Sequence, residues 1–145
     1  MSDQGLEVIE SSSQKTHEWL NQVAELARLE KRDAYKVLRA VLQTVRDRLP
    51  MNDTVHFAAQ LPMFLRGLFY EGWEPAKVPI KMSVEEFLAA VQEKVVTDRV
   101  IDPLRLTQAV LAVMATHVGL HEMAKVKHAF PKDMQGLFPP AADGL

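Results

Sequence analysis

The feature that most constrains the fold of this chain is an internal repeat. When the sequence is compared with itself at an offset of 69 residues, segment 33–70 aligns on segment 102–139 without a gap. The identities are Ala40-Val41-Leu42 with Ala109-Val110-Leu111, Gly67-Leu68-Phe69 with Gly136-Leu137-Phe138, Asp33 with Asp102, and Pro62 with Pro131. Upstream, at an offset of 68, Trp19-Leu20 and Val23 align with Phe87-Leu88 and Val91. Because the matches include proline and glycine, which punctuate local structure, we predict two tandem copies of one unit.

Each copy has the periodicity of α-helices. In the first copy, apolar residues recur at helical spacing over 19–27 and again over 38–49, and no segment alternates as a β-strand does. Thr16, Asp33 and Asp102 stand where helices should begin, and each can cap free amides with its side chain. Ser83 and Glu86 have the spacing of a capping box at the start of the second copy.

A proline divides the later part of each copy. Pro62 and Pro131 interrupt the helical pattern, so we predict a break followed by short helices over 62–69 and 131–138. Gly67 and Gly136 fall inside these short helices, where glycine is unfavourable by about 1 kcal/mol relative to alanine. We therefore expect a neighbouring helix to approach closely at both glycines.

The predicted fold is all-α. Two tandem repeats of a three-to-four-helix unit pack face to face as one compact helical domain, because the apolar stripes are too wide for one unit to stand alone. The expected organisation is a flexible N-terminal tail (1–13), a single domain (14–138) and a C-terminal tail (139–145). Within the domain, repeat one covers 14–70, a packed linker covers 71–82 and repeat two covers 83–138.

Four strings carry a resemblance to a known family. They are Leu38-Arg39-Ala40-Val41-Leu42, Val45-Arg46-Asp47-Arg48-Leu49, Ala58-Ala59-Gln60-Leu61-Pro62 and Arg66-Gly67-Leu68-Phe69-Tyr70-Glu71-Gly72-Trp73. Together they resemble the bacterial family catalogued as domain of unknown function 2267, over 16–139. The resemblance implies a small all-helical protein with no established activity. Many members repeat the Gln-Leu-Pro string in the second half, where this chain has Ala129-Phe130-Pro131.

Composition excludes several classes of protein. The 145 residues include no cysteine, so a disulfide scaffold, a thiolate zinc site and a thiol nucleophile are all ruled out. The formal net charge of -2 disfavours a nucleic-acid binder that depends on bulk charge. No apolar run is long enough for a membrane span, and 1–13 lacks the blocks of a signal peptide. We expect a cytoplasmic protein.

The candidate binding residues lie in the first repeat. Arg39, Arg46 and Arg66 are followed by the aromatic residues Tyr70 and Trp73, and this cluster is a candidate ligand or partner site. The alternative is architecture, in which the guanidinium groups join helices and the aromatic rings pin the linker. In either case Arg46 borders the apolar stripe, so it should not be a free surface charge.

No catalytic constellation can be assembled from the sequence. There is no glycine-rich phosphate loop and no nucleophile elbow, and His117 and His121 are separated by a helix-ending glycine. We therefore predict no catalytic residues, no cofactor and no metal. The leading hypothesis is a non-enzymatic protein-interaction or scaffold module with a protein partner. The alternative is a small-ligand or anion-binding protein that uses the Arg/aromatic cluster. The sequence leaves the oligomeric state open.

Overall fold

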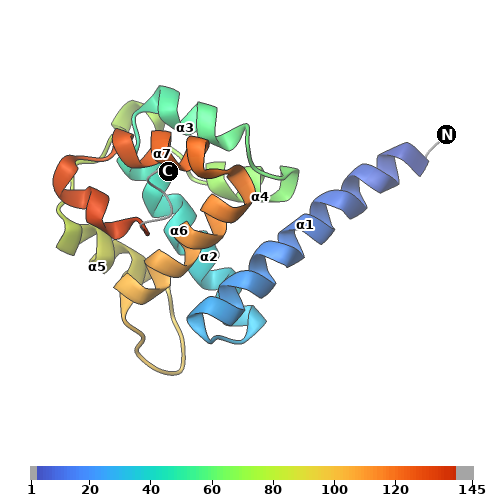
Figure 1. The fold of residues 1–145 in the computed structure, drawn as a ribbon, viewed down its shortest axis with the longest axis horizontal. Coiled ribbons are helices and arrows are strands. Elements are labelled where there is room, and N and C mark those ends of the chain that lie inside the picture. Colours follow the sequence, from blue (N-terminus) through green and yellow to red (C-terminus); the bar gives the residue numbers. More distant parts are fainter. Residues whose placement is uncertain (1–2, 140–145) are drawn as a thin grey trace.

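The structure, a computed structural model, describes residues 3–139, with side chains from Leu6 onward. The prediction of an all-α fold is confirmed, since the described residues form helices and no strand (Figure 1). The elements are α1 (Asp3–Ala27), α2 (Lys31–Arg48), α3 (Met51–Ala58), α4 (Met63–Tyr70), the 3-10 helix η1 (Pro75–Lys77), α5 (Val84–Lys94), α6 (Pro103–Val118), α7 (Leu120–Ala129) and the 3-10 helix η2 (Lys132–Leu137). Across 3–139, no helix is both long enough and apolar enough to cross a membrane.

The ends of α5 and α6 are those that local chemistry predicts. The Ser83 side chain accepts a hydrogen bond from the Glu86 amide, and the Glu86 side chain accepts one from the Ser83 amide, which completes the capping box. Asp102 caps α6 by accepting a hydrogen bond from the Leu104 amide at 3.0 Å. Gly119 ends α6 with a φ of 91°, a left-handed conformation that glycine adopts without strain.

Two predicted helix starts are wrong. The second helix begins at Lys31 rather than Asp33, with Glu30 at the N-cap position. The first helix begins at Asp3 rather than after Thr16, so residues 3–13, expected as a flexible tail, are its first turns. Inside this helix the Thr16 hydroxyl donates to the carbonyl of Ser12 at 2.8 Å, a bond that a threonine can make without ending a helix. Most of the expected C-terminal tail, 140–145, lies outside the described residues.

The core is built around α2 and α6. Leu42 and Leu111, which occupy the same position in the two aligned segments, are both buried at the centre of these helices. α1 packs against α2 and α6, while α5 packs against α6 and α2. Each half of the chain therefore covers the apolar stripe of the other, as well as its own.

The contacts of the first half have counterparts in the second. α4 packs on α2 and α1, and η2 packs on α6 and α5 in the same way. Pro62 and Pro131 precede α4 and η2 with nearly identical backbone angles, φ -55° with ψ 151° and φ -56° with ψ 150°. A side chain also repeats its bond, because Arg66 donates to the Leu61 carbonyl and Gln135 donates to the Phe130 carbonyl, both at 3.1 Å.

The predicted close helix approach at the two glycines is wrong. A Cβ added at Gly67 or Gly136 would meet no atom within 4 Å outside its own turn. Neither glycine is therefore required for packing. The short element of the second half also differs from the prediction, since it is a 3-10 helix where the first half has the α-helix α4.

The linker between the halves lies against the domain. It contains η1, and the amide of Ile80 donates to the carbonyl of Asp47 in α2 at 2.7 Å. Trp73 contacts Tyr70 at the end of α4, with ring centroids 5.3 Å apart. The linker is thus fixed to the first half by a backbone bond at one end and by an aromatic contact at the other.

Candidate functional site

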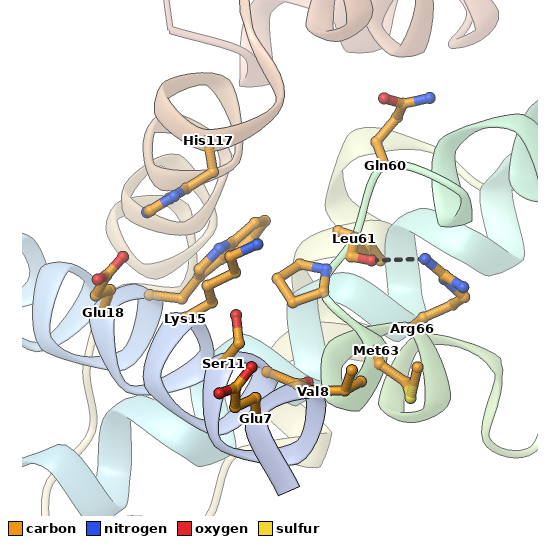
Figure 2. A pocket seen from close by; sticks show the side chains of 13 residues that line it. Glu7, Val8, Ser11, Lys15, Glu18, Gln60, Leu61, Met63, Arg66 and His117 are labelled. Carbon is orange, nitrogen blue, oxygen red and sulfur yellow. Dashed lines mark hydrogen bonds between the residues drawn. The ribbon is translucent and has the colours of Figure 1, made fainter. Parts of the chain in front are cut away.

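An open groove of about 830 Å³ lies where α1 passes the loop between α3 and α4. Lys15 and Glu18 reach it from α1, Leu61 and Arg66 border it from the loop and α4, and His117 borders it from α6 (Figure 2). The groove therefore has one wall from the long first helix and the other from the Pro62 break. Its position follows from that proline, which ends the helical path and turns the chain toward α1.

The floor of the groove is closed by an aromatic stack. The rings of Trp19 and His117 lie 4.8 Å apart and are inclined by only 16°. His117 Nε2 lies 2.8 Å from Gln22 Oε1, so Nε2 carries the proton and donates to the amide oxygen. Burial lowers the pKa of His117 below its ordinary value of 6.5, and Glu18 acts in the opposite sense. The imidazole is therefore neutral at neutral pH, which suits a ring stacked on an indole.

Ser12 joins α1 to α4. Pro62 occupies the N-cap position of α4 and offers no side-chain acceptor. The hydroxyl oxygen of Ser12 instead accepts the hydrogen bond of the free Phe64 amide at 2.9 Å. A helix end with no acceptor of its own is thus capped from a different helix, and this fixes the angle at which α1 leaves the domain.

A second, mostly apolar hollow of about 490 Å³ lies beside the groove. Its walls are Ile9, Thr16 and Leu20 of α1, Tyr35 of α2, and Met63 and Phe64 of α4, with Ser12, Ser13 and His17 between them. Ile9 is 66% exposed and Phe64 is 51% exposed, although both are large apolar side chains. Contiguous exposed apolar surface of this kind is typical of interaction sites.

The exposed residues of α1 continue its buried stripe. Residues 6, 9, 13, 16, 20, 23 and 27 follow one another at alternating spacings of three and four, which places them on one helix face. Thr16, Leu20, Val23 and Ala27 are buried against the domain. Leu6 and Ile9 continue the same face beyond the edge of the domain, where α1 projects alone (Figure 1). The sequence analysis missed both residues, and this heptad spacing was the signal that pointed to them.

Arg46 of the predicted Arg/aromatic cluster is buried and fully engaged. Only 4% of the residue is exposed. Its Nε and Nη2 donate to Asp47 Oδ1 at 2.9 and 2.8 Å, and its Nη1 donates to the carbonyls of Phe69 and Glu71 at 3.0 and 2.6 Å. These carbonyls belong to the last turn and the end of α4, so the guanidinium supplies the cation that a helix C-terminus favours. The expectation that Arg46 is not a free surface charge is confirmed.

Three further members of the predicted cluster lie near Arg46, and one does not. Arg39 pairs with the exposed carboxylate of Glu71 at 2.9 Å, and its hydrogen bond lowers the pKa of Glu71 below 4.5. The rings of Tyr70 and Trp73 are in tilted contact at the end of α4. Arg66 instead donates to the carbonyls of Ala58 and Leu61 and borders the groove at the start of α4.

Lys94 joins this cluster from the second half of the chain, and the sequence analysis missed it. Its Nζ donates to the Thr44 hydroxyl of α2 at 3.3 Å. Burial lowers the pKa of Lys94, Asp47 opposes this effect, and the nearby Arg46 and Arg39 lower it further. No local signal in the sequence connects Lys94 with residues about 50 positions earlier.

These features define a small all-helical protein with an open groove and an apolar hollow beside a projecting helix. Residues 16–137 match the model of the family described as uncharacterized conserved protein (DUF2267), and the chain belongs to this family. The resemblance found in the sequence is therefore confirmed. The matched segment starts at Thr16, so the projecting half of α1 precedes it. No curated protein matches the chain.

Proposed function

We propose that this chain is a non-enzymatic protein-interaction module that binds an amphipathic helix along α1 and the start of α4. The observation that carries the proposal is the apolar stripe of α1, which runs past the edge of the domain at Leu6 and Ile9. Met63 and Phe64 extend the same apolar surface from the neighbouring helix. Exposure of this much apolar surface is unfavourable in water and is relieved when a partner covers it.

The dimensions of the hollow favour a helix as the partner. Its lining on α1 extends from Ile9 to Leu20, which is about 17 Å at 1.5 Å per residue, or three helical turns. A bound helix would place anchors at spacings of three and four residues along this length. The polar members Ser12 and Ser13 are small, so they leave room for large side chains of the partner.

Photo-cross-linking in cells tests this function. A benzoylphenylalanine at position 9 should cross-link to a partner, and mass spectrometry should place the link in an amphipathic helix of that partner. The control carries the same group at Val100, which is exposed on the loop between α5 and α6, away from the projecting end of α1 (Figure 1). A purified pair should then bind, and Ile9→Glu should weaken it. A link to no helix, or equal linking from both positions, would contradict the proposal.

The proposal includes the tandem-repeat architecture. The packing of α1 on α2 and α6 matches that of α5 on α6 and α2, and the packing of α4 on α2 and α1 matches that of η2 on α6 and α5. Together with the equivalent bonds of Arg66 and Gln135, this supports a common ancestry of the two units. In this interpretation the two halves have diverged at one site. Leu61 borders an open groove, whereas its counterpart Phe130 packs edge-on against Phe87 and Phe138. The groove then belongs to the first unit alone.

A second candidate function is anion binding by the Arg/aromatic cluster. The observation that favours it is the approach of Lys94 to Arg39 and Arg46, which gathers three cations around the carboxylates of Asp47 and Glu71. Inorganic phosphate is the simplest probe. If the cluster binds anions, phosphate should raise the melting temperature of the chain, and Lys94→Gln should abolish that rise. A melting temperature that phosphate leaves unchanged would remove this candidate.

A further inference from the structure

The projecting half of α1 offers both parts of one interface. It carries the exposed apolar residues Leu6 and Ile9, and it also forms one wall of the hollow that could receive such residues. We infer that the occupant of the hollow is a second copy of this chain, whose α1 pairs with the first in an antiparallel direction. This inference rests on the proposed function and names its partner.

The apolar parts of the surface are complementary to themselves. Ser12, Ser13 and Thr16 are the small residues on the α1 wall of the hollow, whereas Ile9 at its edge and Leu6 beyond it are large and lie one to three turns earlier. If two α1 helices cross within residues 11–14, a two-fold axis brings Leu6 and Ile9 of each copy against the small residues of the other. Large side chains then meet small ones twice. A second α1 therefore fills the hollow of the first copy and at the same time brings its own exposed stripe, Leu6 and Ile9, into contact.

The charges also favour pairing between copies. Glu7 and Glu10 are the charged side chains described on the projecting half, and both are exposed. Lys15 and His17 follow on the next turns, with Glu18 after them. In the antiparallel arrangement the acidic stretch 7–10 lies alongside Lys15 of the other copy, where the opposite charges attract.

The same charged residues disfavour a parallel arrangement of the two helices. It would place each Glu7 and each Glu10 beside its own counterpart, and like charges at an interface repel. It would also set Leu6 against Leu6 and Ile9 against Ile9, so that these large side chains would not meet the small residues of the hollow. Charge and side-chain size therefore select the same direction of pairing, and the two-fold symmetry limits the assembly to a dimer.

Sedimentation of the full chain tests whether the dimer forms. The expected result is a concentration-dependent shift from monomer to dimer. Leu6→Glu combined with Ile9→Glu should raise the dissociation constant by about tenfold or more, since it adds charge to the apolar side chains that each copy places against the other. The matched control is Leu26→Glu, an exposed leucine of the same helix beyond the hollow. Circular dichroism verifies that each variant is folded. A monomer at all concentrations, or equal weakening by the control, would overturn the inference.

Cysteine cross-linking tests the direction of pairing, and the chain is well suited to it because it has no cysteine of its own. Ser13→Cys lies close to the proposed crossing point, so two copies should form a disulfide under mild oxidation. Leu6→Cys lies far from its counterpart in an antiparallel pair and should not cross-link with itself. Equal cross-linking at both positions would indicate parallel helices and overturn the inference.

The two proposals fail on different results. A chain that stays monomeric in sedimentation contradicts self-pairing, but it leaves the helix-binding function to the photo-cross-link at position 9. If that cross-link identifies a helix of another protein, the hollow is a docking site for that partner. If it identifies α1 of a second copy, both proposals are supported together.

Discussion

Substitution of Arg46 by lysine is the most informative single change in the domain. The guanidinium makes four donor contacts to three acceptors, namely the Asp47 carboxylate and the carbonyls of Phe69 and Glu71. A lysine ammonium is a point donor on a flexible stem, so it keeps the charge but cannot span all three acceptors. The variant thus separates the geometry of the side chain from its charge.

The expected loss of stability follows from these contacts. Two of the acceptors lose their charged donor, and a hydrogen bond to a charged group contributes about 1.5–3 kcal/mol. Partial relaxation of the lysine recovers some of this, so we expect a net loss of about 3 kcal/mol. For a chain of this size that corresponds to a fall in melting temperature of about 8 °C. The change should be read from thermal melts and from urea unfolding, which reports the free energy without extrapolation from high temperature.

Arg39→Lys is the matched control for this experiment. Arg39 makes an exposed pair with Glu71, and such pairs contribute about 1 kcal/mol or less. Its melting temperature should therefore stay within about 3 °C of the parent. If Arg46→Lys melts like the parent and instead loses a stabilisation by added phosphate, Arg46 serves an external anion and the structural reasoning is refuted.

Three further expectations can be checked with the same assays. Leu111→Ala should destabilise the domain by about 2–5 kcal/mol, because the residue is buried at the centre of α6, and an unchanged urea midpoint would contradict that burial. Ser12→Ala should lower stability by about 0.5–2 kcal/mol through loss of the α4 cap, whereas Ser13→Ala should not, and equal effects would show that the Phe64 amide has another acceptor. The free energy of unfolding should fall as the pH drops from about 7.5 to 5.5, because the pKa of His117 is lowered in the folded state and protonation therefore favours the unfolded chain. His117→Gln should flatten this part of the pH profile. If the variant has the same pH profile as the parent, the stack tolerates a charged imidazole.

The helices that could be predicted from the sequence are those whose ends are set locally. The capping box at Ser83, the cap at Asp102 and the breaks at Pro62 and Gly119 each depend on residues within one turn, and the structure has all of them. Leu42 could be assigned to the core for a similar reason, because the apolar spacing alone selects the buried face of a helix.

The extent of α1 could not be predicted in this way. Ser11, Ser12 and Ser13 are poor helix formers, so the local pattern indicates a loose end. What supports the helix there is the bond between Ser12 and the Phe64 amide, 52 residues later in the chain. An element held by a distant partner carries no local signal of that partner.

The spatial grouping of the Arg/aromatic residues could be predicted from the sequence only in part. Arg39, Arg46, Tyr70 and Trp73 gather around the end of α4, as their proximity in the first half of the sequence suggested. Arg66 also belongs to α4, but it lies near the start of that helix, whereas the other four residues gather at its end. Its side chain donates to carbonyls of α3 and of the loop that precedes α4. Whether these residues bind a ligand remains a prediction, since their described contacts are with the chain itself.

The way each half covers the other has a consequence for synthesis of the chain. α1 is sheltered by α6, and Trp19 meets its stacking partner His117 nearly 100 residues later. The first half therefore leaves the ribosome with one flank of its apolar stripe uncovered, and it stays so until α6 has been made. Contacts this distant delay productive collapse, because the intervening loop must close first. Nascent chains of this protein should accordingly depend on holding chaperones for most of their translation, and a ribosome that stalls before α6 should release a chain that aggregates.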